Sequence, residues 1–365
     1  MKNNFLKQKV IMNIGITGFS GSGKTTLFNS FTGNTSENSK TKMAMVSIPD
    51  ERLTELSELF KPKKTTYSLV QFEDLPSLDV HEKSEKVRFY ERMRVMDAYV
   101  IIISAFKAQD AQEVQEEIKK MRLELIIGDL EFVINRMEKL DREMQLSPKN
   151  RDVKEKERAF LLRLQGILEE DRFIFGEEFE KEQNELIRTY GLLTLKPACF
   201  VLNFSENQKT EYVGELVKIS GDMLIEKNDA SPVIAVNALI ESDIASMSED
   251  DRRVFIKEYA IEKLGRDKVI QTAFKLLDLI NFFTVGENEC RSWIIRQGST
   301  ALDAAGSIHT DFARGFIRAE VIAYDELLKL GSLYNAKNTG KLRLEGKTYI
   351  VKDGEIVHIM FNVSK

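Results

Sequence analysis

Short apolar runs recur through the first two thirds of the chain and predict buried strands. The segment DAYVIIISAF at residues 97–106 is almost uniformly apolar, which is typical of a strand covered on both faces of a sheet. Comparable runs occur in KVIMNIGITG, TYSLVQFEDL, KPACFVLNFSEN and SPVIAVNALIE. Segments with helical spacing separate these runs, and this alternation predicts an open α/β fold with a mostly parallel sheet.

From Val114 onward the apolar residues follow a different spacing, which predicts a long helix. Apolar positions there alternate between steps of three and four with one exception: Val114, Ile118, Met121, Leu125, Leu130, Val133, Met137, Leu140 and Met144. The segment LSPKN at 146–150 predicts a turn, and helical spacing resumes from Phe160 to Leu168. We therefore expect an antiparallel helical hairpin, assigned to residues 131–189, inserted into an α/β domain formed by 1–130 and 190–280.

The pattern changes again near residue 281. INFFTV and SWIIRQG predict strands, and KTYIVKDGEIVHIMF predicts a β-hairpin with Asp353-Gly354 at its tip. We expect residues 281–365 to form a separate α+β domain.

Composition excludes several classes of protein. An apolar content of 42% and a charged content of 30% indicate a globular chain with enough core to fold. The net charge of −5 predicts no general affinity for nucleic acid and no DNA sequence specificity, so any RNA contact needs a local basic patch. No run approaches the ~18 apolar residues of a membrane span, and the N-terminal stretch is too polar for a secretory signal. We expect a cytoplasmic protein without membrane contact.

One motif indicates the chemistry. Residues 18–25 match G-x-x-x-x-G-K-[ST], between a predicted strand and the helical segment KTTLFNSFTG. Glycines let backbone N–H groups face phosphate oxygens, where the helix N-terminus adds its positive dipole end. Lys24 would neutralise the β- and γ-phosphates, and the Thr25 hydroxyl would ligate Mg²⁺. The predicted phosphate-binding residues are Gly18, Phe19, Ser20, Gly21, Ser22, Gly23, Lys24, Thr25 and Thr26.

A magnesium ion needs a second oxygen ligand. Asp74 ends the predicted strand at 66–75, and its carboxylate could reach the metal through water. We therefore predict Thr25 and Asp74 as the magnesium site, and Lys24, Thr25 and Asp74 as the catalytic residues. Thr35 and Thr41 are alternative further ligands between which the sequence does not choose.

The base is predicted from the end of a later strand. GTPases recognise guanine with Asn-Lys-x-Asp, whereas this chain has Asn203-Phe204-Ser205-Glu206, without the lysine and the aspartate. Asn203 can hydrogen-bond the amino edge of adenine, and Phe204 can lie against the ring. The sequence therefore favours ATP, with GTP as the alternative. The remaining expected nucleotide contacts are Glu206, Asn237, Ala238 and Leu239.

These residues resemble the Obg-like ATPase (YchF) family over nearly the whole chain. IPDERLTELSELFKPKKTT at 48–66 is similar to the stretch after switch I, and Asn203 and Glu206 carry the family's Asn-x-x-Glu signature. GSIHTDFARGFIRAEVIAYDELL and KLRLEGKTYIVKDGEIVHIMFNV resemble its C-terminal TGS domain, which is β-grasp-like. The resemblance implies a P-loop NTPase domain, a helical insertion and a TGS domain. It also implies slow ATP hydrolysis and association with ribosomes in translation or stress regulation.

The chain departs from the family pattern around the phosphates. Gly21 stands where the family usually has Asn, and the family's Asp-x-x-Gly is here Asp74-Leu75-Pro76-Ser77. The Cβ of Ser77 and the rigid Pro76 restrict how closely the amide of residue 77 approaches a γ-phosphate. Leu78 stands where related GTPases place a catalytic glutamine. A role for His81 as base is less favoured than a solvated side chain.

Three functions remain open from the sequence. The leading one is a weakly active, Mg²⁺-dependent ATPase that acts as a conformational switch. The alternative is a nucleotide-sensing module that docks on ribosomes or RNA without hydrolysis, and a small-molecule kinase is the third. Candidate RNA contacts are the KPKK segment at 61–64 and Arg291, Arg296, Arg314 and Arg318, while His309 is expected to be structural or partner-binding.

Overall fold

The computed structural model describes residues 12–33, 42–78, 83–147, 150–259, 261 and 263–362. The chain divides into two compact units. The larger contains Asn13–Ala44 and Phe72–Ala273, and the smaller contains Met45–Gln71 and Phe274–Lys365. No helix in the described part of the chain is long and apolar enough to cross a bilayer.

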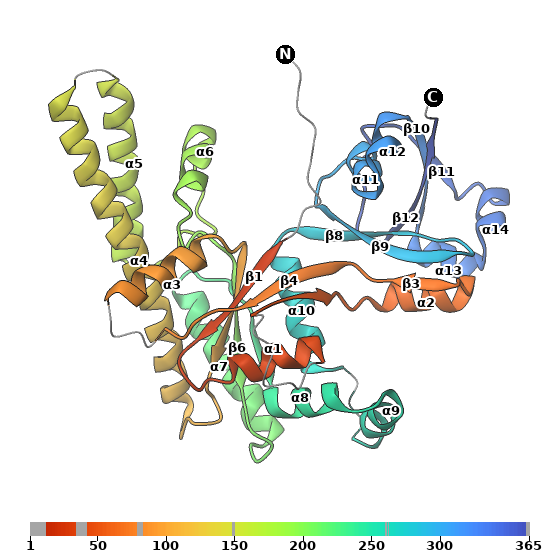
Figure 1. Ribbon diagram of the computed structural model, residues 1–365, viewed down its shortest axis with the longest axis horizontal. Coiled ribbons are helices and arrows are strands. Elements are labelled where there is room, and N and C mark those ends of the chain that lie inside the picture. The colour runs from red at the N-terminus through yellow and green to blue at the C-terminus, as the bar shows by residue number, and fades with distance from the viewer. Residues whose placement is uncertain are drawn as a thin grey trace. The chain divides into compact units, whose positions relative to one another are not determined.

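A six-stranded sheet forms the centre of the larger unit (Figure 1). Its order is β2 (Met43–Ser47), β4 (Leu69–Asp74), β1 (Asn13–Gly18), β5 (Ala98–Ile103), β6 (Ala198–Asn203) and β7 (Val233–Val236). The last four strands pair in parallel. Every residue of β5 and β6 is buried, as their continuous apolar runs predict. The predicted α/β fold with a mostly parallel sheet is therefore confirmed.

Helices connect these strands. They are α1 (Lys24–Thr32), α3 (Lys83–Arg94), α7 (Thr210–Glu226), α8 (Ala238–Ser246), α9 (Glu249–Glu258) and α10 (Gly265–Leu276). Helix α1 ends as predicted at Gly33, whose φ of 65° lies in the left-handed region that favours glycine.

The predicted helical hairpin is present. It consists of α4 (Ala111–Leu146) and α5 (Arg151–Glu169), followed by α6 (Lys181–Tyr190), and Figure 1 shows α4 and α5 side by side in yellow. All the predicted seam positions of α4 are buried except Leu130 and Met144, which are half-buried. Helix α4 begins well before residue 131, capped by Asp110, because its first turns share the core of strand β5.

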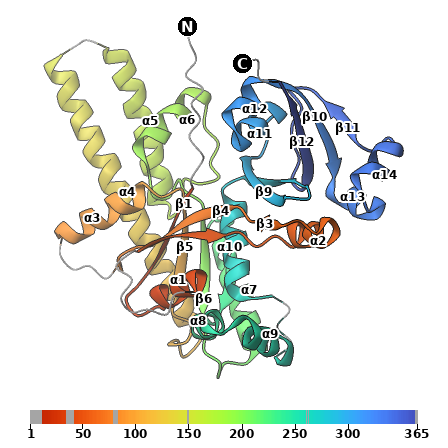
Figure 2. The same ribbon diagram turned by 45° about the vertical axis from the view of Figure 1, so that its right-hand side comes forward.

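The smaller unit contains a second six-stranded sheet (Figure 2). Its order is β11 (Arg343–Glu345), β10 (Phe316–Ala323), β12 (Glu355–Phe361), β8 (Leu279–Thr284), β9 (Glu289–Arg296) and β3 (Lys64–Thr66). Its helices are α2 (Glu51–Phe60), α11 (Ala301–Ile308), α12 (Thr310–Arg314), α13 (Tyr324–Leu330) and α14 (Leu333–Asn338). One hydrophobic cluster includes alanines of α11, and another includes leucines of α2 and α13.

Helix α2 and strand β3 belong to the smaller unit, and β3 joins its sheet, although we expected all of residues 1–130 within the α/β domain. Strand β3 pairs in parallel with β9, and Leu53 and Leu56 of α2 are fully buried against residues of the C-terminal strands. The buried Asn281 donates to Asp50 over 3.0 Å. An amphipathic helix needs an apolar partner, and here the C-terminal sheet provides it.

The hairpin predicted at 347–361 is wrong in its pairing. Gly354 turns with a φ of 81°, as expected, but the segment before it forms no strand and makes an isolated bridge from Ile350 to Thr300. Strand β12 instead pairs antiparallel with β10 and parallel with β8. Strand β10 pairs with β12 along almost its whole length, from Phe316 to Ala323, so β12 is held by a strand distant in sequence.

Candidate nucleotide-binding site

The loop between β1 and α1 has the conformation that its glycines predict. Gly21 and Gly23 have φ values of 67° and 94°, and a Cβ on Gly23 would lie 2.2 Å from the Asn203 amide nitrogen. A Cβ on Gly18 would lie 2.5 Å from the Ile102 carbonyl oxygen. No side chain of the described residues caps α1. The first N–H groups of this helix are therefore available for an anion.

Lys24 lies inside this loop. Its side chain is buried, and Nζ donates to the carbonyl oxygens of Gly18 (3.2 Å) and Phe19 (3.1 Å) and to Ser77 Oγ (3.0 Å). The structure therefore brings the divergent Ser77 into direct contact with the lysine of the phosphate-binding motif.

Thr25 and Asp74 also meet as predicted. Thr25 Oγ1 donates to Asp74 Oδ2 over 2.9 Å, while the buried Asp74 Oδ1 has no hydrogen-bond partner among the described residues. Burial raises the pKa of Asp74, although the Thr25 hydrogen bond and the charges of Lys24 and Lys42 oppose the rise. An unpaired carboxylate oxygen beside a hydroxyl is a donor set that fits Mg²⁺.

Asn203 joins two parts of the site. Its Nδ2 donates to the Ser22 carbonyl oxygen over 2.9 Å, and its Oδ1 accepts from the Ala238 N–H over 3.0 Å. The side chain therefore connects the phosphate-binding loop to the start of α8. Since Nδ2 carries a second proton, it can still donate to a ring nitrogen of a purine.

The other predicted base contacts lie just after Asn203 in sequence or at the start of α8, where the Ala238 N–H donates to Asn203. Phe204 is half-buried, Glu206 and Leu239 are exposed, and Ala238 is buried. Asn237 caps α8 by accepting from the Ile240 N–H over 3.1 Å, which gives it a structural role.

Sequence reasoning missed the loop after β5. The Phe106 N–H donates to the Asn203 carbonyl oxygen over 2.8 Å, and the Phe106 ring is 38% exposed. The signal was available: β5 and β6 are parallel, and the carboxyl ends of adjacent parallel strands lie at the same edge of a sheet.

Several predicted residues lie elsewhere. Thr35, Thr41 and His81 are outside the described residues. His309 accepts from the Asp311 N–H through Nδ1 over 3.2 Å and so caps α12. Among the candidate RNA contacts, Arg314 pairs with Asp311, and the Arg291 guanidinium lies 4.1 Å from the centre of the Trp293 ring.

Two protein-family models match the chain. A family model described as a 50S ribosome-binding GTPase matches residues 13–136. A second, named for the C-terminal part of YchF GTPases and described as a protein of unknown function, matches residues 279–362.

Relatives match over almost their full length. The ribosome-binding ATPase YchF of Bacillus subtilis (strain 168) is 35% identical over 372 residues, which cover 96% of this chain and 99% of the relative. Its namesake from Escherichia coli O157:H7 is 32% identical over 370 residues with the same coverage. The structure of the Schizosaccharomyces pombe YchF GTPase matches with a TM-score of 0.80 and 27% identity, covering 96% of this chain and 97% of that chain. The chain therefore belongs to the YchF family.

Proposed function

We propose that this protein binds ATP with Mg²⁺, hydrolyses it slowly and associates with ribosomes as a cytoplasmic nucleotide-dependent switch. The observation that carries the proposal is the meeting of Lys24, Thr25 and Asp74 around a loop with glycine geometry and an uncapped helix N-terminus. The names of the bacterial relatives support ATP as the nucleotide and the ribosome as the partner.

Each residue of the site has a distinct role in this proposal. The loop amides and the Lys24 ammonium hold the β- and γ-phosphates. Thr25 and Asp74 would hold Mg²⁺, which when bound supplies positive charge to the phosphate oxygens. Asn203, Phe204 and Glu206 contact the base, and Asn203 also fixes the loop against α8.

We propose ATP over GTP because the acidic clamp for guanine is absent. At the strand end the chain has Phe204 where the guanine motif has lysine, and Glu206 where it has aspartate. The exposed Glu206 has a longer side chain than aspartate, so its carboxylate is less fixed than the guanine motif requires.

A non-hydrolysing nucleotide sensor is the second candidate, and Ser77 favours it. The Ser77 hydroxyl holds Lys24, and Pro76 restricts the backbone that must approach the γ-phosphate. Leu78 is buried, and its aliphatic side chain has no hydrogen-bonding group that could orient water.

Single-turnover cleavage of ATP separates the two candidates. Enzyme in excess over labelled ATP is mixed with Mg²⁺, with and without ribosomes, and phosphate release is followed. We expect slow release that ribosomes modulate. Binding of ATP without phosphate release in either condition would contradict hydrolysis and leave the sensor.

A further inference from the structure

The loop between β5 and α4 places a second lysine beside the phosphate-binding loop. Ser104 is fixed by Glu117, which accepts from its N–H over 3.0 Å and from its hydroxyl over 2.8 Å. The Lys107 N–H then donates to the Ser104 carbonyl oxygen over 2.9 Å, and Phe106 is bonded to Asn203. These contacts hold the backbone of Lys107 at the edge of the sheet where the candidate site lies.

Gly21 leaves room for the Lys107 ammonium. A Cβ built on Gly21 would lie 2.9 Å from Lys107 Nζ, closer than real Cβ contacts. Any side chain at position 21 would therefore displace this ammonium, and it would also be strained at a φ of 67°. Lys107 Nζ thus lies directly against the backbone whose amides are proposed to bind phosphate.

The charge of Lys107 is not neutralised by the described part of the chain. No carboxylate there forms an ion pair with it, and its nearest aromatic ring is that of Phe106, 5.5 Å from Nζ to the ring centre. An exposed ammonium beside the glycine turn of the phosphate-binding motif is suited to an anion.

The two lysines reach the loop from different sides. Lys24 Nζ contacts the oxygens of Gly18, Phe19 and Ser77 within the loop. Lys107 follows Phe106, whose N–H donates to the Asn203 carbonyl oxygen. Asn203 lies at the proposed base-binding end of the site. Gly21, against which the Lys107 ammonium lies, belongs to the loop whose amides are proposed to hold the β- and γ-phosphates.

We infer that Lys107 is a nucleotide-binding residue whose ammonium pairs with the β-phosphate, in a space that Gly21 keeps open. This inference rests on the proposed function, since it requires that the loop binds a nucleotide. The β-phosphate is present in both ATP and ADP, so this ammonium would contribute to the binding of both nucleotides.

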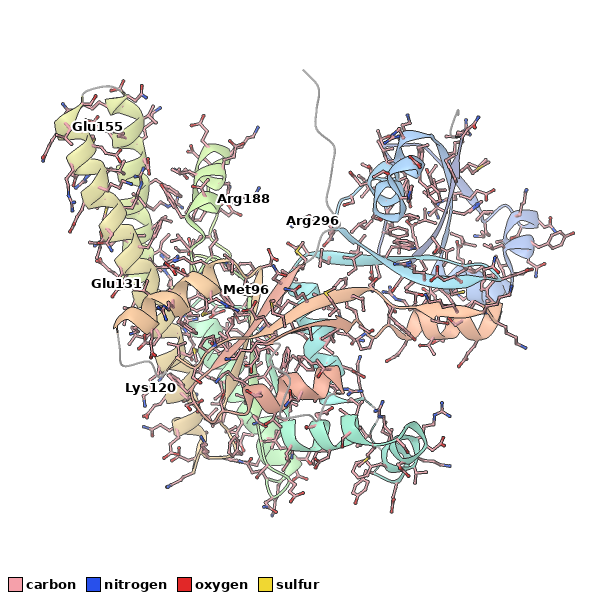
Figure 3. All side chains as sticks on the ribbon, in the orientation of Figure 1. Met96, Lys120, Glu131, Glu155, Arg188 and Arg296 are labelled. Carbon is pink, nitrogen blue, oxygen red and sulfur yellow. The ribbon has the colours of Figure 1, made fainter. Side chains whose placement is uncertain are left out.

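Calorimetric titration of three variants tests the inference. Lys107→Met keeps an apolar stem and removes the charge, Lys107→Arg keeps the charge, and Lys120→Met is the matched control on the exposed face of α4, labelled in Figure 3. We expect Lys107→Met to weaken ATP and ADP equally, by about tenfold. Lys107→Arg should restore most of this loss, and Lys120→Met should bind as the wild type does.

Two outcomes would overturn the inference. Wild-type affinity in Lys107→Met would show that the ammonium binds no phosphate, and a loss restricted to ATP would place it on the γ-phosphate. Failure of the proposed function is a separate result, because the wild-type chain itself would then bind neither nucleotide.

Discussion

At the scale of single residues, a small set of hydrogen bonds holds the candidate site together. Lys24 donates to Ser77, Thr25 donates to Asp74, and Asn203 connects the phosphate-binding loop to the start of α8. Changes at Asp74 and Ser77 should therefore affect nucleotide binding and hydrolysis.

The buried Asp74 carboxylate is expected to lower the stability of the nucleotide-free protein and to strengthen Mg²⁺ binding. Burial raises the pKa of Asp74 in the folded state. At pH values between the unfolded and folded pKa, the folded protein therefore binds more protons than the unfolded chain. The free energy of unfolding then falls as pH rises through that window. Asp74→Asn should remove this fall and raise the melting temperature of the nucleotide-free protein at neutral pH. It should also weaken Mg²⁺-dependent ATP binding by about tenfold. Thermal melts across pH and titrations with and without Mg²⁺ measure both effects, and a lower melting temperature at neutral pH would contradict the first.

Ser77 is expected to slow hydrolysis. Ser77→Gly removes the hydroxyl that holds Lys24 and returns the backbone freedom that a γ-phosphate contact requires. We expect single-turnover cleavage several-fold faster than in the wild type, on the order of 1 kcal/mol of barrier. Ser77→Ala is the control, because it removes the hydroxyl but keeps the Cβ. If both variants cleave ATP at the wild-type rate, Ser77 does not limit the reaction.

The sequence predicted that Lys24, Thr25 and Asp74 lie together, the first two from the phosphate-binding motif and the third from its place at a strand end. It did not reveal that Asn203 hydrogen-bonds both the phosphate-binding loop and the start of α8, since those bonds depend on the register of β6 beside β7.

At the scale of elements, the spacing of apolar residues along the chain predicted the helices and the buried strands. The seam of α4 and the core of α5 were visible because each apolar position faces one core. The pairing of β12 and the place of 45–71 were not visible, since both depend on which distant strand offers an apolar face.

A buried ion pair fixes the N-terminal third of α4. Arg122, which is 1% exposed, bonds Asp229, donates to the Asp171 carbonyl oxygen over 3.0 Å and lies over the ring of Phe173. Burial lowers the pKa of Arg122, and the two acidic partners oppose this. Asp229→Ala should destabilise the protein by about 3–5 kcal/mol, because it leaves a buried guanidinium without its partner.

Urea unfolding measures this loss, and a double variant provides the control. Arg122→Met combined with Asp229→Ala removes both charges and should recover part of the stability. Equal stability of the Asp229→Ala variant and the wild type would show that the pair contributes nothing.

At the scale of the molecule, the chain combines a nucleotide-binding unit with a second sheet built from two distant segments. The family resemblance predicted the C-terminal domain, because its sequence blocks are long and specific. It did not predict that β3 would extend that domain's sheet, since a three-residue polar strand has no period of its own. All residues of the candidate site lie within the larger unit.

Calorimetric titration of ATP against GTP, with Lys24→Ala as the control, tests the central claim most directly. We predict that ATP binds more tightly than GTP, because the acidic guanine clamp is missing, and that Lys24→Ala nearly abolishes binding of both. Tighter binding of GTP would contradict the assignment of the base, and normal binding by Lys24→Ala would contradict the phosphate site itself.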